Sequence, residues 1–402
     1  MPMPTSVVAG DADQTGYADD IAAYRRDFRQ YLERVEAGQH WRAAALNTTE
    51  AAMAHDAAIM AQLHRDGWNR LGWPESAGGR GGTEIHRAVY YEELGRAGSA
   101  VPAQHWTLET LGPALLRFAP RLAARYLPCY LRGEEWWGQC FSEPDAGSDL
   151  AALRTRAVHS GDGDFVVTGQ KIWTSQGATA TRLLALVRTG TTASRHRGLT
   201  MMLIDADAPG VTVRPIALAS GRRELAEVFF DEVRVPDTRL VGHVDDGWTV
   251  AMYLMQFERG MYGYALLTSL LADMSSLRAA MSSPDTSAAG RERFARTYIE
   301  VTAAQARAAQ TVRDLAHRRP IGPQSSIDKL LFSTAEREVH DLILDVRHGE
   351  LIGGEGGADA AVDTARAAWW YSRAATIMGG TAEIQRGIIA DHVLGLPREA
   401  SR

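Results

Sequence analysis

Apolar residues recur at three- and four-residue intervals in the first third of the chain. Ile21, Tyr24 and Phe28 are an example, because this spacing places them on one face of a helix. The pattern predicts an N-terminal helical domain over residues 17–137. Residues 1–16 lack it and are expected to form a loose tail.

The pattern changes to short apolar runs over residues 138–243. Runs such as 165–167, 183–187 and 199–204 are rich in β-formers and are separated by Gly, Asp and Pro. An Asp-Gly step at Asp162 supplies a hairpin signal before the first of them. Several short strands at this spacing predict a central β-domain, either a small barrel or a sandwich.

Helical periodicity returns from residue 244 to residue 402, opening with Val250, Leu254 and Phe257. The order of helices, strands and helices predicts an α+β fold in which an all-β module lies between two helical parts.

Composition narrows the class of protein. The 402 residues are 45% hydrophobic and 23% charged, as in soluble globular proteins. The net charge of −6 argues against a nucleic-acid partner and a polybasic membrane patch. No apolar run reaches 18 residues and no leader pattern precedes the helices, so we expect a cytoplasmic protein without a membrane span. Two cysteines, Cys129 and Cys140, cannot build a disulfide framework.

Common catalytic signatures are absent. The chain has no phosphate-binding GxxxxGK[ST] loop, no GxGxxG after a strand, no GxSxG and no HExxH. Its twelve histidines are scattered, with no pair three or four residues apart. We therefore expect no metal site.

Two neighbouring segments carry candidate binding chemistry. The turn at 139–149 offers free N–H groups and hydroxyls that could hold a polar ring or a phosphate, although a domain-joining turn explains it equally well. Trp173 beside Thr174 and Ser175 could stack on an aromatic cofactor while the hydroxyls meet its polar edge. A lone Trp is more often part of a core.

Two further candidates lie in the C-terminal part. Glu258 interrupts a largely apolar helix and is either a partly desolvated base or half of an ion pair. Gly379 and Gly380 permit close backbone approach, and Thr381 can cap the helix that follows.

Taken in order, these segments resemble the acyl-CoA dehydrogenase family, and the match covers almost the whole chain. Single motifs are weak, but five lie in the family's order: 73–75 with 91–97, 142–149, 171–175, 224–236 with 247–248, and 380–386. The resemblance implies an N-terminal helical domain, a central β-barrel or sandwich domain and a C-terminal four-helix bundle.

The resemblance also implies non-covalent FAD and its binding residues. By analogy, the flavin ring would be held by the 139–148 turn and the strand after it, through Gln139, Phe141, Ser142, Gly147, Ser148, Trp173, Thr174 and Ser175. Thr381 and Glu383 would lie near the flavin and its nucleotide portion. Ser148, Arg259 and Gly379 would contact the acyl-CoA.

One departure from the family pattern concerns the base. Many members place a catalytic Glu directly before the Gly-Thr of the last motif, where this chain has Gly379. A minority carries the Glu in a Glu-Arg pair on a C-terminal helix, and Glu258-Arg259 resembles that arrangement. The resemblance thus implies Glu258 as the α-proton base, with Gly379 donating its N–H to the thioester oxygen.

A second departure concerns assembly. Segment 350–356 has Glu350 where the family has Gln in an interface motif for the adenine side of FAD, while 320–330 resembles a bacterial branch used on steroid side chains and bulky acyl groups. Some enzymes of that branch are heterotetramers. We expect a homotetramer or an α2β2 heterotetramer, with electron-transferring flavoprotein as acceptor, and FAD stoichiometry stays open.

Two alternatives remain at this stage. A flavin monooxygenase on the same fold would usually lack a placed carboxylate such as Glu258. A non-catalytic subunit of a heterotetramer should show an eroded flavin turn, whereas Glu143, Pro144 and Trp173 are intact.

Overall fold

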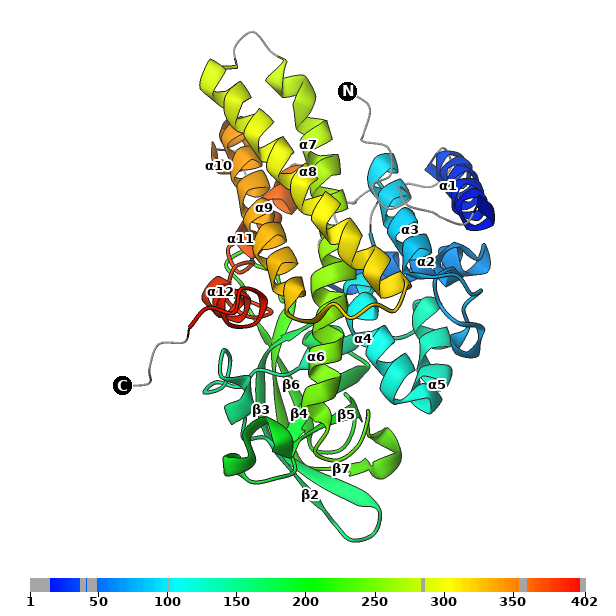
Figure 1. Ribbon diagram of the computed structural model, residues 1–402, viewed down its shortest axis with the longest axis vertical. Coiled ribbons are helices and arrows are strands. Elements are labelled where there is room, and N and C mark those ends of the chain that lie inside the picture. The colour runs from blue at the N-terminus through cyan, green and yellow to red at the C-terminus, as the bar shows by residue number, and fades with distance from the viewer. Residues whose placement is uncertain are drawn as a thin grey trace. The chain divides into compact units, whose positions relative to one another are not determined.

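The computed structural model describes residues 15–36, 41, 49–99, 101–282, 286–353 and 360–397. Most of the predicted tail, and the end of segment 350–356 from residue 354 onward, lie outside the described residues. The chain forms two compact units that interleave along the sequence (Figure 1). The first, called the helical unit, takes its described residues from 1–52, 80–101 and 258–402; the second, called the mixed unit, is 53–79 and 102–257.

The helical unit contains only helices within its described residues. In chain order they are α1 (Thr15–Glu36), α3 (Glu84–Ala97), the π-helical turn η7 (Glu258–Tyr262), α7 (Gly263–Met281), α8 (Ala288–Ala316), the short 3-10 helix η8 (Gly322–Gln324), α9 (Ser325–Val346), α10 (His348–Gly353), α11 (Ala360–Ser372), α12 (Ala382–Ile388) and the π-turn η9 (Ile389–Val393). Helices α7, α8 and α9 pack against one another, and α11 packs against α9. They form the four-helix bundle predicted for the C-terminal part.

Buried charge ties α1 to α3 inside this unit. Glu93 is almost fully buried, and its carboxylate accepts hydrogen bonds from Arg25 (3.0 Å), Arg29 (2.8 Å) and Arg96 (2.8 Å). Although burial opposes ionisation, the guanidinium groups of Arg29, Arg96 and Arg25 hold the pKa of Glu93 below its ordinary value. A charged Glu at a core position is therefore satisfied by three cations.

The mixed unit combines helices with one sheet. Its helices are α2 (Thr49–Arg65, most of which belongs here), α4 (Gln104–Phe118), α5 (Pro120–Leu131) and α6 (Gly247–Phe257). Its strands are β1 (Trp137–Cys140), β2 (Arg156–His159), β3 (Asp164–Ser175), β4 (Arg182–Arg188), β5 (Leu199–Asp205), β6 (Val211–Ile216) and β7 (Leu225–Pro236). The runs used for the β-domain prediction all fall within these strands.

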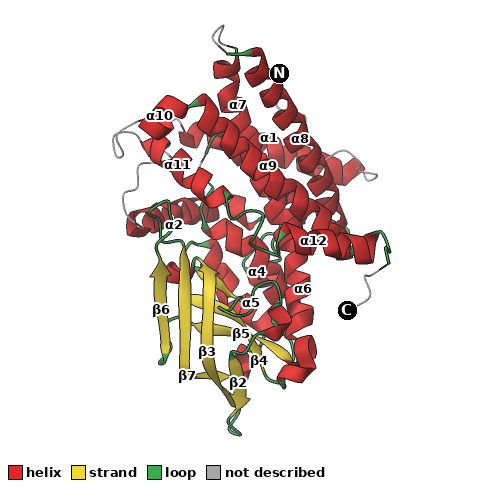
Figure 2. Cartoon of the chain, turned by 90° about the vertical axis from the view of Figure 1, so that its left-hand side faces the viewer, coloured by secondary structure: helices red, strands yellow, loops and turns green. Residues whose placement is uncertain are grey.

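The sheet is mixed and curled. Its strand order is β1-β4-β2-β3-β7-β6, with β5 on β4, and β1 also pairs with β3 through Gln139 and Ser175. The extra pairing places β1 against both β4 and β3, so that β1, β4, β2 and β3 form a closed ring of paired strands. Strands β3, β7 and β6 continue the sheet side by side (Figure 2). The α+β fold with a central β-domain is thereby confirmed.

The position of β4 in the sheet explains why its sequence is continuously apolar. Leu184 and Leu186 belong to the core shared with α4, α5 and α6, whereas Leu183 and Val187 belong to a second core on the other face of the sheet. Side chains alternate between faces along a strand, so a strand covered on both sides has no polar positions to spare.

In the described part of the chain, no helix has the length and apolar character needed to cross a membrane.

Candidate functional site

The turn predicted to hold a ring begins directly after β1. The backbone groups of Glu143 and Ala146 bond each other reciprocally (3.0 and 3.1 Å), which closes a tight turn. The N–H of Ile172 donates to the carbonyl of Ser142 (3.0 Å), so the turn lies along β3. Gly147 and Ser148, at the end of the turn, are exposed.

A buried ion pair anchors this turn. One Glu143 oxygen accepts from Lys171 Nζ (2.8 Å) and from the N–H of Thr155 (2.8 Å), and the other accepts from the N–H of Arg154 (2.6 Å). Lys171 is fully buried and also donates to the carbonyl of Phe141 (3.0 Å). Burial opposes ionisation, but the Lys171 charge and these hydrogen bonds hold the pKa of Glu143 below its ordinary value.

The sequence analysis named Glu143 as part of the flavin turn, but it missed the pairing of Glu143 with Lys171. A signal was available, since a Lys at a core position of a strand requires a buried partner. Glu143, the acidic residue of the preceding turn, was the candidate for that partner. Their pairing makes the turn a rigid part of the sheet rather than a loose connection.

Trp173 has an unusual conformation. Its backbone is left-handed, with φ of 59°, and the pairing of β3 with β7 shifts register between Lys171 and Thr174. A bulge of this kind redirects a side chain out of the regular alternation. The indole is 54% exposed, which is rare for such a large apolar group. Trp173 is thus not part of a core, contrary to the bland alternative for a lone Trp.

The other predicted flavin contacts of this unit differ in exposure. Thr174 is fully buried and its hydroxyl lies 3.5 Å from the Cys140 sulfur, so its side chain serves the core. Phe141 is also buried, whereas Gln139, Ser142 and Ser175 are half-buried. Exposed backbone and small polar groups beside an exposed, bulged Trp fit a flat polar ring.

The predicted base lies in the helical unit, on η7. Helix α6 runs to Phe257, and the chain continues as the π-turn Glu258–Tyr262 before α7 begins. The sequence analysis expected one uninterrupted helix; the wider turn was not anticipated. Single π-turns are frequent at functional sites because they displace side chains from the regular helical register.

Glu258 has no partner among the described residues. Its side chain is half-buried, and no hydrogen bond or ion pair to its carboxylate occurs within the described ranges. The adjacent Arg259 instead directs Nη1 toward the hydroxyls of Ser325 and Ser326, each 3.4 Å away. The ion-pair alternative for Glu258 is therefore not what the described side chains form.

Glu258 and Gly379 lie in direct proximity. A Cβ built on Gly379 would lie well under 3.0 Å from Oε1 of Glu258 and 3.5 Å from Cε of Lys329. Gly379 also has φ of +66°, a left-handed value that glycine adopts freely. Only glycine leaves this space to the Glu258 carboxylate.

The residues after Gly379 hold the segment in place. The buried Gln385 donates Nε2 to the carbonyls of Gly379 (3.3 Å) and Gly380 (3.2 Å). The Thr381 hydroxyl accepts from the N–H of Ile384 (3.3 Å) and caps α12. Glu383 is exposed, with its carboxylate 3.4 Å from Arg386.

Arg259, predicted to contact the acyl-CoA, is half-buried. Its Nε is buried without a hydrogen-bond partner in the described part of the chain. Burial lowers the pKa of Arg259, while the charges of Glu258 and Asp328 work against that effect. Its Nη2 lies 4.0 Å from the position of a Gly380 Cβ, so this guanidinium borders the glycine segment.

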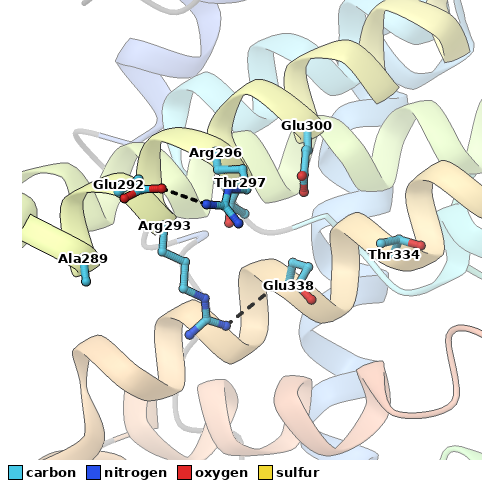
Figure 3. Close-up of a pocket in the computed structure, with 8 residues that line it drawn as sticks. All are labelled: Ala289, Glu292, Arg293, Arg296, Thr297, Glu300, Thr334 and Glu338. Carbon is cyan, nitrogen blue, oxygen red and sulfur yellow. Dashed lines mark hydrogen bonds and ion pairs between the residues drawn. The ribbon is translucent and has the colours of Figure 1, made fainter.

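A surface hollow of about 500 Å³ in the helical unit contains none of these residues (Figure 3). It lies on α8 and α9 and is lined by Ala289, Glu292, Arg293, Arg296, Thr297, Glu300, Thr334 and Glu338. Its charges pair among themselves, Arg296 with Glu292 (2.8 Å) and Arg293 with Glu338 (3.7 Å). Both arginines of the hollow are thus paired with carboxylates, and none of the residues predicted for catalysis or cofactor binding lies in it.

Three family models match consecutive parts of the chain. They describe the N-terminal domain (residues 19–134), the middle domain (138–233) and the C-terminal domain (245–394) of acyl-CoA dehydrogenases.

Similar proteins carry the same description. The acyl-CoA dehydrogenase IpdE1 of Mycobacterium tuberculosis is 38% identical over 395 residues, covering 95% of this chain and 99% of the relative. Among solved structures, the Tcur3481-Tcur3483 steroid ACAD has a TM-score of 0.78 at 26% identity, covering 95% of this chain and 98% of that one. The ChsE4-ChsE5 complex of Mycobacterium tuberculosis has a TM-score of 0.74 at 26% identity, with 94% and 98% covered.

Proposed function

The chain belongs to the acyl-CoA dehydrogenase family of flavoprotein oxidoreductases, and on that basis we propose that it oxidises an acyl-CoA thioester between Cα and Cβ, with Glu258 as the base. One observation carries the proposal. The Glu258 carboxylate is half-buried, has no partner among the described side chains, and occupies the space that a side chain at position 379 would need.

The proposed reaction explains why such a carboxylate is needed. The α-proton of a thioester is weakly acidic, so the base must be ionised, close and correctly aimed. Glu258 is the first residue of a π-turn. The next residue, Arg259, donates to the hydroxyls of Ser325 and Ser326, and these bonds fix the backbone from which the Glu258 side chain extends. The Gly379 N–H is the proposed donor to the thioester oxygen, where negative charge develops.

The hydride that leaves Cβ needs an acceptor that no side chain provides. FAD, when bound, supplies flavin N5 as this acceptor. The proposed ring contacts are the turn after β1 and the exposed indole of Trp173, which together leave a flat apolar face beside exposed polar groups. Thr381 and Glu383 are the proposed contacts toward the nucleotide portion. Ser148, at the exposed end of the turn, is the proposed contact to the acyl-CoA arm.

The substrate class and the partners are also proposals. Similarity to a steroid ACAD supports a bulky, steroid-type acyl group. Similarity to the ChsE4-ChsE5 complex supports an α2β2 heterotetramer beside the homotetramer. Exposed apolar side chains near the C-terminus, including Trp370, Ile377 and Leu394, favour burial between subunits. Electron-transferring flavoprotein is the proposed acceptor.

An anaerobic spectrum of the purified protein tests the proposal. We expect bound flavin whose visible absorbance bleaches on addition of an acyl-CoA, with a product that mass spectrometry finds to be two hydrogen atoms lighter. The panel should contain straight-chain, branched and steroid-side-chain thioesters. Flavin that no acyl-CoA reduces, but that consumes oxygen with another substrate, would favour a monooxygenase. Absence of flavin until a second subunit is supplied would favour the partner-subunit alternative.

A further inference from the structure

Lys329 is a buried cation beside the Glu258 carboxylate. It lies on α9, is 4% exposed, and its Nζ donates to the carbonyl of Ala375 (2.7 Å). Its Cε lies 3.5 Å from the point at which a Gly379 Cβ would stand, and Oε1 of Glu258 lies even closer to that same point. The lysine side chain and the carboxylate therefore both border the space beside the Gly379 Cα, on the same side of its backbone.

No direct ion pair compensates this ammonium within the described residues. Besides the Ala375 carbonyl, its other contact is the ring of Phe332, with Nζ 4.6 Å from the ring centroid. Burial lowers the pKa of Lys329, and the charges of Glu258 and Glu336 oppose that effect. A buried ammonium with one carbonyl and one ring is costly unless nearby anions compensate it through space.

The other charged and titratable groups around this pair come from several elements. They are Arg259 and Tyr262 on η7, Asp328 and Glu336 on α9, Arg307 on α8, Tyr371 on α11, and Arg373 after it. Asp328 is occupied by the Thr311 hydroxyl (2.6 Å) and by Arg307 (3.5 Å). Burial raises the pKa of Glu336 to about 7, so that carboxyl is only partly ionised near neutrality. Among the neighbouring carboxylates, Glu258 is therefore the one that interacts most strongly with the Lys329 charge.

A purely structural role does not require the charge. Lys329 joins α9 to the segment before Gly379 through a single hydrogen bond to Ala375. A methionine could fill the same buried space with no desolvation cost. The presence of a charge therefore indicates an electrostatic role toward Glu258, the carboxylate that also borders Gly379.

We propose that Lys329 is a positioning residue that keeps Glu258 ionised, and hence able to accept the α-proton, at lower pH than an uncompensated carboxylate in this place. The role rests on the proposed function, because it matters only if Glu258 is the base. A positive neighbour favours the charged form of a carboxylate, and the same two charges act on each other, since the Glu258 charge opposes the lowering of the Lys329 pKa.

The test replaces the charge while keeping the volume. Lys329→Met is compared with the parent FAD-loaded protein across pH, by stopped-flow flavin reduction with the acyl-CoA found to be active. We expect the acidic limb of the profile to move up by about one pH unit, which is a tenfold loss below the limb and little loss above it. Lys329→Arg should retain the parent limb where it folds.

A control separates charge from packing. Ser333→Ala removes a hydrogen bond to the Lys329 carbonyl (2.7 Å) without altering charge, so it should leave the limb where it is. If Lys329→Met lowers the rate by one factor at every pH, or changes nothing, Lys329 has no electrostatic role and the inference fails.

A second readout does not depend on activity. Isotope-edited infrared titration of 13C-glutamate-labelled protein, with Glu258→Gln as the subtraction reference, follows the Glu258 carboxylate directly. We expect its midpoint to rise in Lys329→Met. A shift seen in protein whose flavin no acyl-CoA reduces would keep this inference and reject the proposed function. An unshifted midpoint in active protein would do the reverse.

Discussion

The carboxylate of Glu258 occupies the space that a side chain on Gly379 would fill. A Cβ at Gly379 would approach Oε1 of Glu258 to well under 3.0 Å, a separation that real Cβ atoms essentially never show. The two positions come from distant parts of the chain, the π-turn after α6 and the segment before α12. In this arrangement the site holds a carboxylate from one of the two positions, not from both.

Glu258→Gln should abolish fast flavin reduction. The amide keeps the size of the side chain but cannot accept the α-proton, so we expect a loss of about 10²–10⁴-fold, the usual worth of a general base. FAD content and acyl-CoA binding should stay at the parent level. Stopped-flow absorbance measures the rate. Glu300→Gln, an exposed residue on α8, is the control. A parent rate in Glu258→Gln would mean that the base is another residue.

Moving the base to position 379 should depend on what remains at position 258. In the Glu258→Gln background, Gly379→Glu should fail to restore activity, because the Gln side chain still fills the space and the backbone is left-handed. In the Glu258→Ala background the space is free, so Gly379→Glu should restore part of the flavin reduction. Equal rates for the two double variants would contradict the steric relationship.

Trp173→Ala should weaken FAD retention without unfolding the protein. Loss of a stacking partner is worth about 0.5–1.5 kcal/mol, which corresponds to roughly two- to twelvefold in affinity. Because the indole is 54% exposed, the free energy of unfolding without FAD should change by less than about 0.5 kcal/mol. Dialysis and the flavin spectrum measure retention. Val158→Ala, an exposed apolar residue on β2, should retain FAD like the parent.

Glu143→Gln should destabilise the mixed unit. The change leaves Lys171 buried without a counter-charge, which costs about 3–5 kcal/mol in comparable cases. Chemical denaturation of FAD-free protein at pH 7 measures it. The double variant Glu143→Gln with Lys171→Met should recover a substantial part of the loss, since no charge then remains buried. A double variant less stable than the single one would contradict this account.

The same pair predicts a pH dependence. The pKa of Glu143 is lowered in the folded protein relative to its ordinary value of 4.5. Its stabilisation is therefore fully present above about pH 4.5 and is lost as pH falls through the lower folded value. The difference in unfolding free energy between the parent and Glu143→Gln should narrow in that window. A difference that stays constant from pH 7 to pH 3 would show that the charge does not matter.

Assembly should bury the exposed apolar groups near the C-terminus. Ile377 is 64% and Leu394 is 63% exposed in the single chain. We expect light scattering to find a tetramer, either alone or with a second subunit type. The double change Ile377→Glu with Leu394→Glu should shift the mass toward smaller species, whereas Val158→Glu on the sheet should not. A stable, FAD-loaded monomer of the parent would contradict the prediction.

The local sequence determined the order of the secondary-structure elements and several candidate site residues. Helical periodicity, short β-rich runs and turn residues depend on neighbours a few positions apart, so the order of helices, strands and helices was readable from the sequence. The same holds for Glu258, a lone acidic group in an apolar stretch, and for Thr381 as a cap. The sequence left open whether Trp173 is part of a core, because the exposure of a side chain depends on which distant segments pack over it.

Only the tertiary structure decided which distant groups meet. The sequence indicated neither that Gly379 gives its space to Glu258 nor that Lys329 lies beside that carboxylate. The π-turn at Glu258 was also invisible, since it differs from a regular helix by one residue of register. These relationships arise when segments far apart in sequence close on one another, and no pattern of neighbouring residues encodes the distance between them.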